Sequence, residues 1–181
     1  MSAMNIGDII LEVKITKDRI IPIEPFKWCY FDEAGIWLLF GSNDNSGYKC
    51  LDAGWTRKIG QEIIYDMGCL SYVEYSNKSG KPYINQFGED CGFKCVSDKT
   101  QECLYPFLAE NYNRLMFVYA FDGTLSSDNE LRAKEKELAH LFHALYWRNG
   151  RAFIKPCAEN RKITCFKDID DIKRLLDGAK S

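Results

Sequence analysis

The sequence contains no apolar run near the roughly 20 residues that a membrane-spanning helix needs. Its first residues, MSAMNIGDII, also lack the basic start and apolar core of a secretory signal. No internal repeat or low-complexity segment is present. With 181 residues, 46% hydrophobic and 28% charged, the chain has the composition of one globular domain. We therefore expect a single cytoplasmic domain with no membrane partner.

An excess of one charge is lacking as well. The chain has 24 Lys and Arg against 26 Asp and Glu, for a net charge of -2 and an isoelectric point near 5.8. A protein that neutralises many phosphates needs a basic surface. The composition therefore excludes broad electrostatic coating of nucleic acid and leaves open only a local basic patch.

Eight cysteines occur without the signal sequence that would favour disulfides. Five stand singly among apolar residues and are interpreted as core: Cys29, Cys50, Cys69, Cys157 and Cys165. The other three, Cys91, Cys95 and Cys103, lie in CGFKCVSDKTQEC, a weaker zinc pattern than paired CxxC motifs. We interpret them as thiols of an irregular loop. A small zinc site at these three cysteines, in an unrelated α+β fold, is an alternative.

Alternating apolar and polar residues predict strands in the first third of the chain. The segment DIILEVKITKDRIIPIE, residues 8–24, is expected to form an N-terminal hairpin. GIWLLF and YKCLDAGW form the next strand pair, with the second strand ending at Gly54. After it, Ile59, Ile63 and Met67 recur at four-residue spacing, which predicts a helix capped by Thr56.

The rest of the chain also divides into predicted strands and helices. Residues 71–88 are expected to form two strands joined by a turn, and a short helix is expected near residues 104–115. RLMFVYAFDG predicts a strand buried on both faces. Residues 126–150 form the clearest helix, with Gly150 as its stop, and residues 167–180 a terminal amphipathic helix. The expected cap of the clearest helix is Ser126, Ser127 or Asp128, and its expected core stripe is Leu131, Leu138, Leu141 or Phe142, and Leu145.

This order of elements predicts an α+β fold with a small mixed or antiparallel sheet flanked by helices. The glycine-led strand GIW at 35–37, the strand ending in DAG at 52–54 and the helix that follows together resemble the GIY-YIG nuclease superfamily. EKELAHLFHALYWRN resembles that superfamily's late helix. It places Glu137 at the metal-binding glutamate and Asn149 roughly three helical turns later. MFVYAF, directly before, fits the third strand.

The resemblance implies a β-β-α-β-α core within the single domain. Its expected parts are N-terminal strands at 1–28, the core at 34–70 and 112–150, an insertion with the three cysteines at 71–111, and a strand and helix tail at 151–181.

The resemblance also implies a metal-dependent endonuclease acting on nucleic acid. One Mg²⁺ or Mn²⁺ on Glu137 would act as Lewis acid, Asn149 would orient it, and Arg57 or Lys58 would hold the phosphate. The expected catalytic residues are Trp37, Asp52, Arg57, Glu137 and Asn149.

Three positions differ from the superfamily pattern. Trp37 stands for a tyrosine, and its indole cannot act as a base. Asp52 stands where the superfamily has its second tyrosine, and its carboxylate would act as a base or as a second metal ligand. Glu62 stands for the arginine, where a carboxylate repels phosphate. A non-catalytic module that binds protein or nucleic acid on the same scaffold is therefore the alternative. A transition-metal site at Glu137, His140 and His143 is a further candidate.

Overall fold

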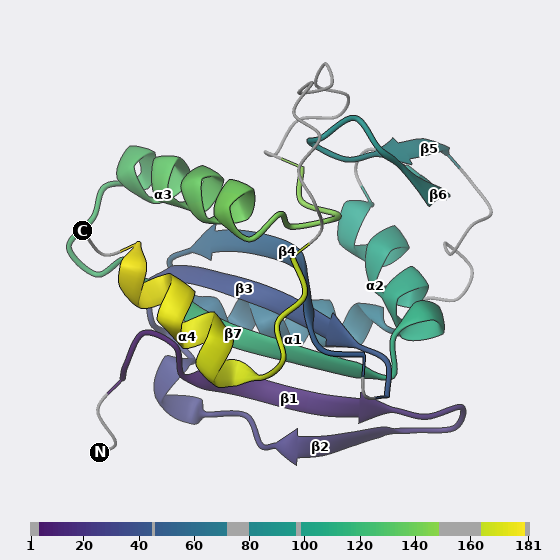
Figure 1. Ribbon diagram of the computed structural model, residues 1–181, viewed down its shortest axis with the longest axis horizontal. Coiled ribbons are helices and arrows are strands. Elements are labelled where there is room, and N and C mark those ends of the chain that lie inside the picture. Colours follow the sequence, from purple (N-terminus) through teal and green to yellow (C-terminus); the bar gives the residue numbers. More distant parts are fainter. Residues whose placement is uncertain (1–3, 45, 72–79, 97–98, 149–163, 180–181) are drawn as a thin grey trace.

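The computed structural model describes residues 4–44, 46–71, 80–96, 99–148 and 164–179. Within them the chain has the predicted α+β architecture, with a five-stranded antiparallel sheet in the order β2-β1-β7-β3-β4 and a separate two-stranded sheet (Figure 1). The strands of the main sheet are β1 (Ile9–Ile15), β2 (Ile20–Glu24), β3 (Gly35–Ser42), β4 (Lys49–Thr56) and β7 (Arg114–Asp122). The small sheet pairs β5 (Lys81–Ile84) with β6 (Asp90–Cys95). The helices are α1 (Ile59–Cys69), α2 (Thr100–Asn111), α3 (Asp128–Leu141) and α4 (Ile169–Gly178), with a 3₁₀ turn η1 (Trp28–Tyr30).

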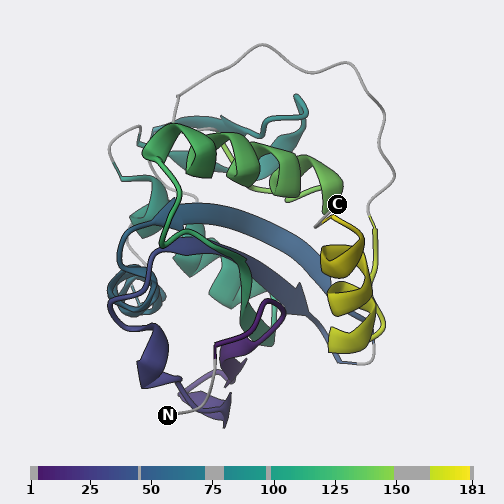
Figure 2. The same ribbon diagram turned by 90° about the vertical axis from the view of Figure 1, so that its left-hand side faces the viewer.

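Helices cover both faces of the main sheet, which therefore buries side chains on both sides. On β3, Trp37 and Leu39 belong to the core beneath α1 and α2, whereas Ile36 and Leu38 belong to the core beneath α3 and α4. In the two ribbon views α3 lies over β3 and β4, and α4 crosses the same face nearer β7 and β1 (Figures 1 and 2). The central strand β7 is buried on both faces, as its continuous apolar sequence predicted.

The predicted N-terminal hairpin is confirmed, and it extends the main sheet through the pairing of β1 with β7. Its burial does not follow simple alternation, because Glu12 is only 4% exposed. The Glu12 carboxylate is paired with Arg114 at 2.7 Å and accepts a hydrogen bond from the Tyr48 hydroxyl at 2.6 Å. Burial and the Glu12 carboxylate raise the pKa of Tyr48 to about 12, so this hydroxyl stays protonated as a donor.

The cysteine segment is not the irregular loop that we expected. Cys91 and Cys95 lie on β6, and Cys103 lies in α2. The segment follows strand and helix geometry because β6 pairs with β5 and α2 starts at Thr100, before the predicted start of the short helix. The first of the two strands predicted within residues 71–88 falls mostly on 72–79, outside the described residues.

Helix α3 begins as predicted. Ser127 forms a capping box with Glu130, in which each side chain accepts from the other residue's backbone N–H. The helix ends at Leu141, however, and the predicted continuation to Gly150 was wrong. His143 adopts a positive φ of 49°, which breaks the helix. The chain then turns back, and the Leu145 and Tyr146 amides donate to the Cys50 and Leu51 carbonyls of β4 at 3.1 and 2.7 Å. Gly150 itself lies outside the described residues.

The predicted start of α1 also needs correction. Strand β4 continues through Gly54 to Thr56, and Lys58 is the N-cap of α1 without a side-chain capping bond. Thr56 instead accepts a hydrogen bond from the Lys58 amide at 3.2 Å, in the turn before the helix. The terminal amphipathic helix is confirmed as α4, whose buried residues include Ile172 and Leu176. No helix in the described part of the chain is both long and apolar enough to cross a membrane.

Candidate functional site

A pocket of about 770 Å³ opens beside the free edge of β4. Within its described residues, the segment after α3 pairs with β4 at Cys50 and Leu51, and the pocket lies next to this pairing, along residues 52–55. Its walls also include residues of α1, the start of α2, β5, α3 and the segment after α3. A pocket of this size, set between two helical layers, is large enough for a small organic ligand.

Trp37 and Gly54 form the floor of the pocket on adjacent strands. The two residues are directly paired across β3 and β4. A Cβ atom at Gly54 would lie 2.3 Å from the Trp37 ring, so glycine is what allows the indole to lie across the strand pair. Trp37 is 3% exposed, and its Nε1 atom has no hydrogen-bond acceptor at normal distance in the described chain. The indole is nevertheless close enough to Glu62 to lower the pKa of that carboxyl.

Three carboxyl groups from three elements line the pocket: Asp52 of β4, Glu62 of α1 and Glu135 of α3. The Asp52 carboxyl accepts a hydrogen bond from the Ala53 amide at 2.9 Å. The Glu135 carboxyl accepts one from the Trp147 indole at 3.0 Å. The elements that carry these side chains meet here because the helices on opposite faces of the sheet both reach its β4 edge.

Burial raises the pKa values of all three carboxyl groups, and repulsion from neighbouring carboxylates adds to it for Asp52 and Glu135. Burial raises the pKa of Asp52 to about 8; the Ala53 amide lowers it, and the Glu135 and Glu62 carboxylates raise it further. Burial likewise raises the pKa of Glu135 to about 7, although the hydrogen bond from the Trp147 indole lowers it. Burial raises the pKa of Glu62, and the side chains of Thr56 and Trp37 lower it by a smaller amount. Asp52 and Glu135 therefore hold protons near neutral pH.

Two arginines lie at the pocket on aromatic rings. The Arg132 guanidinium lies 5.3 Å from the Trp55 ring centre, and the Arg148 guanidinium lies 4.4 Å from the Tyr83 ring centre. The Arg132 guanidinium also lowers the pKa of Glu135, although burial, Trp147 and Glu62 each have a larger effect on that pKa. The leading electrostatic influences on Asp52, by contrast, are the carboxylates Glu135 and Glu62. Asp52 therefore interacts mainly with the other two acidic groups of the pocket rather than with its arginines.

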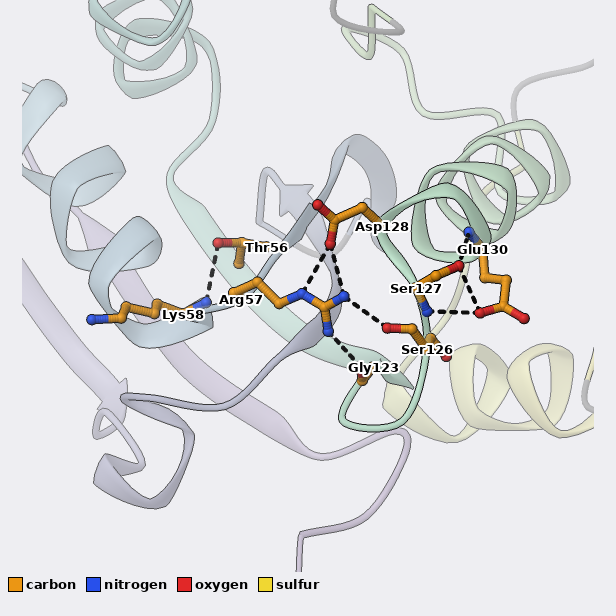
Figure 3. A network of polar contacts seen from close by, with 8 residues as sticks. All are labelled: Thr56, Arg57, Lys58, Gly123, Ser126, Ser127, Asp128 and Glu130. Atoms are coloured by element: carbon orange, nitrogen blue, oxygen red, sulfur yellow. Dashed lines mark hydrogen bonds and ion pairs between the residues drawn. The ribbon is translucent and has the colours of Figure 1, made fainter.

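The structure brings two of the five expected catalytic residues, Trp37 and Asp52, to this pocket. Arg57 is directed elsewhere, as Figure 3 shows. Its guanidinium donates twice to Asp128, at 3.0 and 2.7 Å, and to the Gly123 and Ser126 carbonyls at 3.0 and 2.7 Å. These bonds connect the end of β4 to the loop that starts α3, so Arg57 acts as a structural clamp between the two segments.

Replacing Arg57 by alanine should therefore cost about 1–3 kcal/mol of stability, because two carbonyls and one carboxylate lose a charged donor. Arg57→Lys should recover only part of this loss, since an ammonium cannot reproduce the fork of donors. Urea denaturation measures both effects. The matched control is Lys58→Ala at the exposed neighbouring position, which should change stability by less than about 0.5 kcal/mol. Equal stability of the Arg57→Ala and Lys58→Ala variants would contradict the clamp.

Glu137 does not line the pocket. Its side chain is 55% exposed and pairs with Lys134 at 2.8 Å. Glu135, two residues earlier, occupies the inward position because it lies four residues after Leu131 and three before Leu138, both buried. The resemblance placed the metal-binding glutamate at Glu137. Of the two alternatives for the core stripe, Leu141 is exposed and Phe142 is buried. The spacing from Leu131 and Leu138 alone was a signal for Glu135.

The remaining predicted sites are not assembled in the described chain. Asn149 lies outside the described residues. His143 leaves the helical spacing assumed for a Glu137, His140 and His143 site; it is buried against Phe87 and lies 3.5 Å from Glu89. Among the described residues no group of three or more His, Cys, Asp or Glu side chains is arranged to hold a metal ion. The three pocket carboxylates are therefore spread along the wall rather than gathered at one point.

Comparison with protein-family models, with curated proteins and with solved structures gave no match to this chain.

Proposed function

We propose that this chain is a non-catalytic binding module on a GIY-YIG-like scaffold, and that its pocket binds a cationic ligand. The observation that carries the proposal is the set of three carboxyl groups, Asp52, Glu62 and Glu135, around one pocket. The scaffold is supported by the order of its elements. The strand pair β3 and β4 leads into α1, β7 pairs with β3, and α3 follows β7.

The charge of the pocket argues against phosphate as the ligand. Under the resemblance, Glu62 stands where a nuclease of this superfamily has its phosphate-binding arginine, and it lines the pocket. The arginine that could have replaced it, Arg57, donates to Asp128 and to two carbonyls. A phosphate in the pocket would meet three acidic side chains against two arginines, Arg132 and Arg148, which lie over aromatic rings, and like charges repel.

The Mg²⁺ or Mn²⁺ that the resemblance implies does not fit the residues expected to hold it. Glu137 is paired with Lys134 at the surface, and the oxygen donors of the pocket do not converge in a group of three. Hard divalent cations prefer several oxygen ligands around one point. An organic cation, which spreads its charge over several atoms, matches dispersed carboxylates better.

The proposal predicts that the intact chain binds spermidine and does not bind inorganic phosphate. Titration followed by tryptophan fluorescence reports on Trp37 and Trp147, which line the pocket. The double variant Asp52→Asn, Glu62→Gln should lose the spermidine response. Glu137→Gln is the matched control on α3, and it should respond like the unmodified chain because Glu137 faces solvent.

The same samples test the endonuclease alternative. Plasmid DNA with Mg²⁺ or Mn²⁺ should remain intact with the unmodified chain. Nicking that is lost in Glu135→Gln but retained in Glu137→Gln would overturn the proposal and assign a nuclease active site to the pocket. Absence of any spermidine response would also overturn it.

A further inference from the structure

We propose that the cation recognised by this pocket is a guanidinium group, carried by an arginine side chain or an arginine-derived amine, with Asp52 and Glu62 as its ion-pairing residues. This inference rests on the proposed function and specifies its ligand. The guanidinium is the chemistry shared by a protein arginine and a free small molecule, and the experiment below separates these two sources.

The size and lining of the pocket favour an organic cation over a metal ion. A volume of about 770 Å³ is far more than one ion and its ligands require. The walls combine carboxylates with aromatic rings, including those of Trp37, Trp55 and Trp147. Cations bind the faces of such rings, and tryptophan is the strongest partner among them.

Several features favour guanidinium over ammonium. A guanidinium is planar, weakly hydrated and stacks on aromatic rings, and its five donors suit acceptors that come from different directions. The chain's own arginines already use the rings in this way, since Arg132 lies over Trp55 and Arg148 over Tyr83. The lining holds three carboxyl groups against these two arginines, so one acidic group exceeds the number of the chain's own cations in the pocket.

The proposed binding should release protons. Burial and the neighbouring carboxylates hold protons on Asp52 and Glu135 near neutral pH, and a bound cation favours their ionised forms. A guanidinium itself does not titrate in this range. The ionisable groups around Asp52 that share this equilibrium are Glu62 and Asp66 of α1, Tyr105 of α2, Arg132 and Glu135 of α3, Tyr83 of β5, and Arg148 after α3.

Isothermal titration of the intact chain with three blocked tripeptides tests the inference. They are acetyl-Gly-X-Gly-amide with X as arginine, lysine or citrulline, and citrulline is the uncharged isostere of arginine. The arginine peptide should bind at least about tenfold more tightly than either of the others, equivalent to one lost charge-assisted contact. Its affinity should rise about tenfold per pH unit from pH 6 to 8, with one proton released. Titrations in two buffers of different ionisation enthalpy count that proton.

Variants assign the site. Asp52→Asn should weaken the arginine peptide and remove most of its pH dependence, whereas Glu137→Gln should leave both unchanged. Agmatine in place of the peptide separates the sources: tighter binding of the peptide assigns a protein arginine, and equal or tighter binding of agmatine assigns a free amine. Equal binding of the citrulline peptide would overturn the inference, as would tighter binding of the lysine peptide. A spermidine response without arginine binding would overturn this inference alone and leave the proposed function standing.

Discussion

Between pH 5 and pH 9 the chain should lose several kcal/mol of stability. The pKa of Asp52 is raised to about 8 and that of Glu135 to about 7, whereas both groups titrate near pH 4 in an unfolded chain. The folded state therefore binds more protons than the unfolded state between these values, and stability falls as pH rises. For Asp52 alone the limit is on the order of 5 kcal/mol, lost between about pH 4 and pH 8. Urea denaturation at pH 5, 7 and 9 measures the slope.

The variant Asp52→Asn should flatten this pH dependence. The asparagine keeps an oxygen that can accept from the Ala53 amide but carries no charge at high pH. It should match the unmodified chain only near pH 4 and exceed it in stability increasingly from pH 5 to pH 9. Carboxyl groups with lowered pKa values, such as Asp122 and Asp171, act in the opposite direction only below about pH 4, outside this range. Glu137→Gln serves as the control with an unchanged slope. Stability that is constant or rises from pH 5 to 8 would contradict the assignment.

Arg114→Ala should lower the free energy of unfolding by about 3 kcal/mol, because Glu12 would keep a buried charge without its cation. In a chain of this length such a loss corresponds to a fall of about 6–12 °C in the melting temperature. The Tyr48 hydroxyl would remain as a donor to Glu12, but a neutral hydroxyl does not replace an ion pair. Thermal and urea denaturation measure the change.

Two further variants separate a buried charge from a merely lost contact. The double replacement Glu12→Leu, Arg114→Met removes both charges and should recover most of the lost stability, since apolar replacement of a buried pair is often neutral. Arg174→Ala removes an ion pair with Asp171 in which the arginine side chain is 76% exposed, and it should cost less than about 1 kcal/mol. If Arg114→Ala were no more damaging than Arg174→Ala, the buried-charge explanation would be wrong.

The elements that could be predicted from the sequence are those whose own pattern determines them. The hairpin alternates over residues 8–24, β7 is apolar throughout, and α4 carries an apolar stripe behind the Asp168 cap. Ser127 and Glu130 have the spacing of a capping box, so the start of α3 could also be predicted from the sequence. In each case the signal lies within a few residues of the element.

The errors arose where a distant segment competes with local propensity. Residues 142–150 have a helical pattern, but the backbone of Leu145 and Tyr146 pairs with β4, some 95 residues earlier in the chain. The sequence also contains no local signal that β5 pairs with the cysteine segment. Such pairings replace helical or loop hydrogen bonds with equivalent ones across the fold, so local preference cannot decide between them.

The sequence by itself determined the α+β class, the strand pair at 35–56 and the presence of Trp37 and Asp52 on it, because strand periodicity and glycine placement are local properties. Only the tertiary structure decided that the face of α3 with Glu135, and not the face with Glu137, meets Asp52, that Arg57 is a clamp, and that Glu62 completes an acidic pocket. The reason is geometric: a shift of two residues turns a helical side chain by about 200°, and which side is inward depends on what the helix packs against.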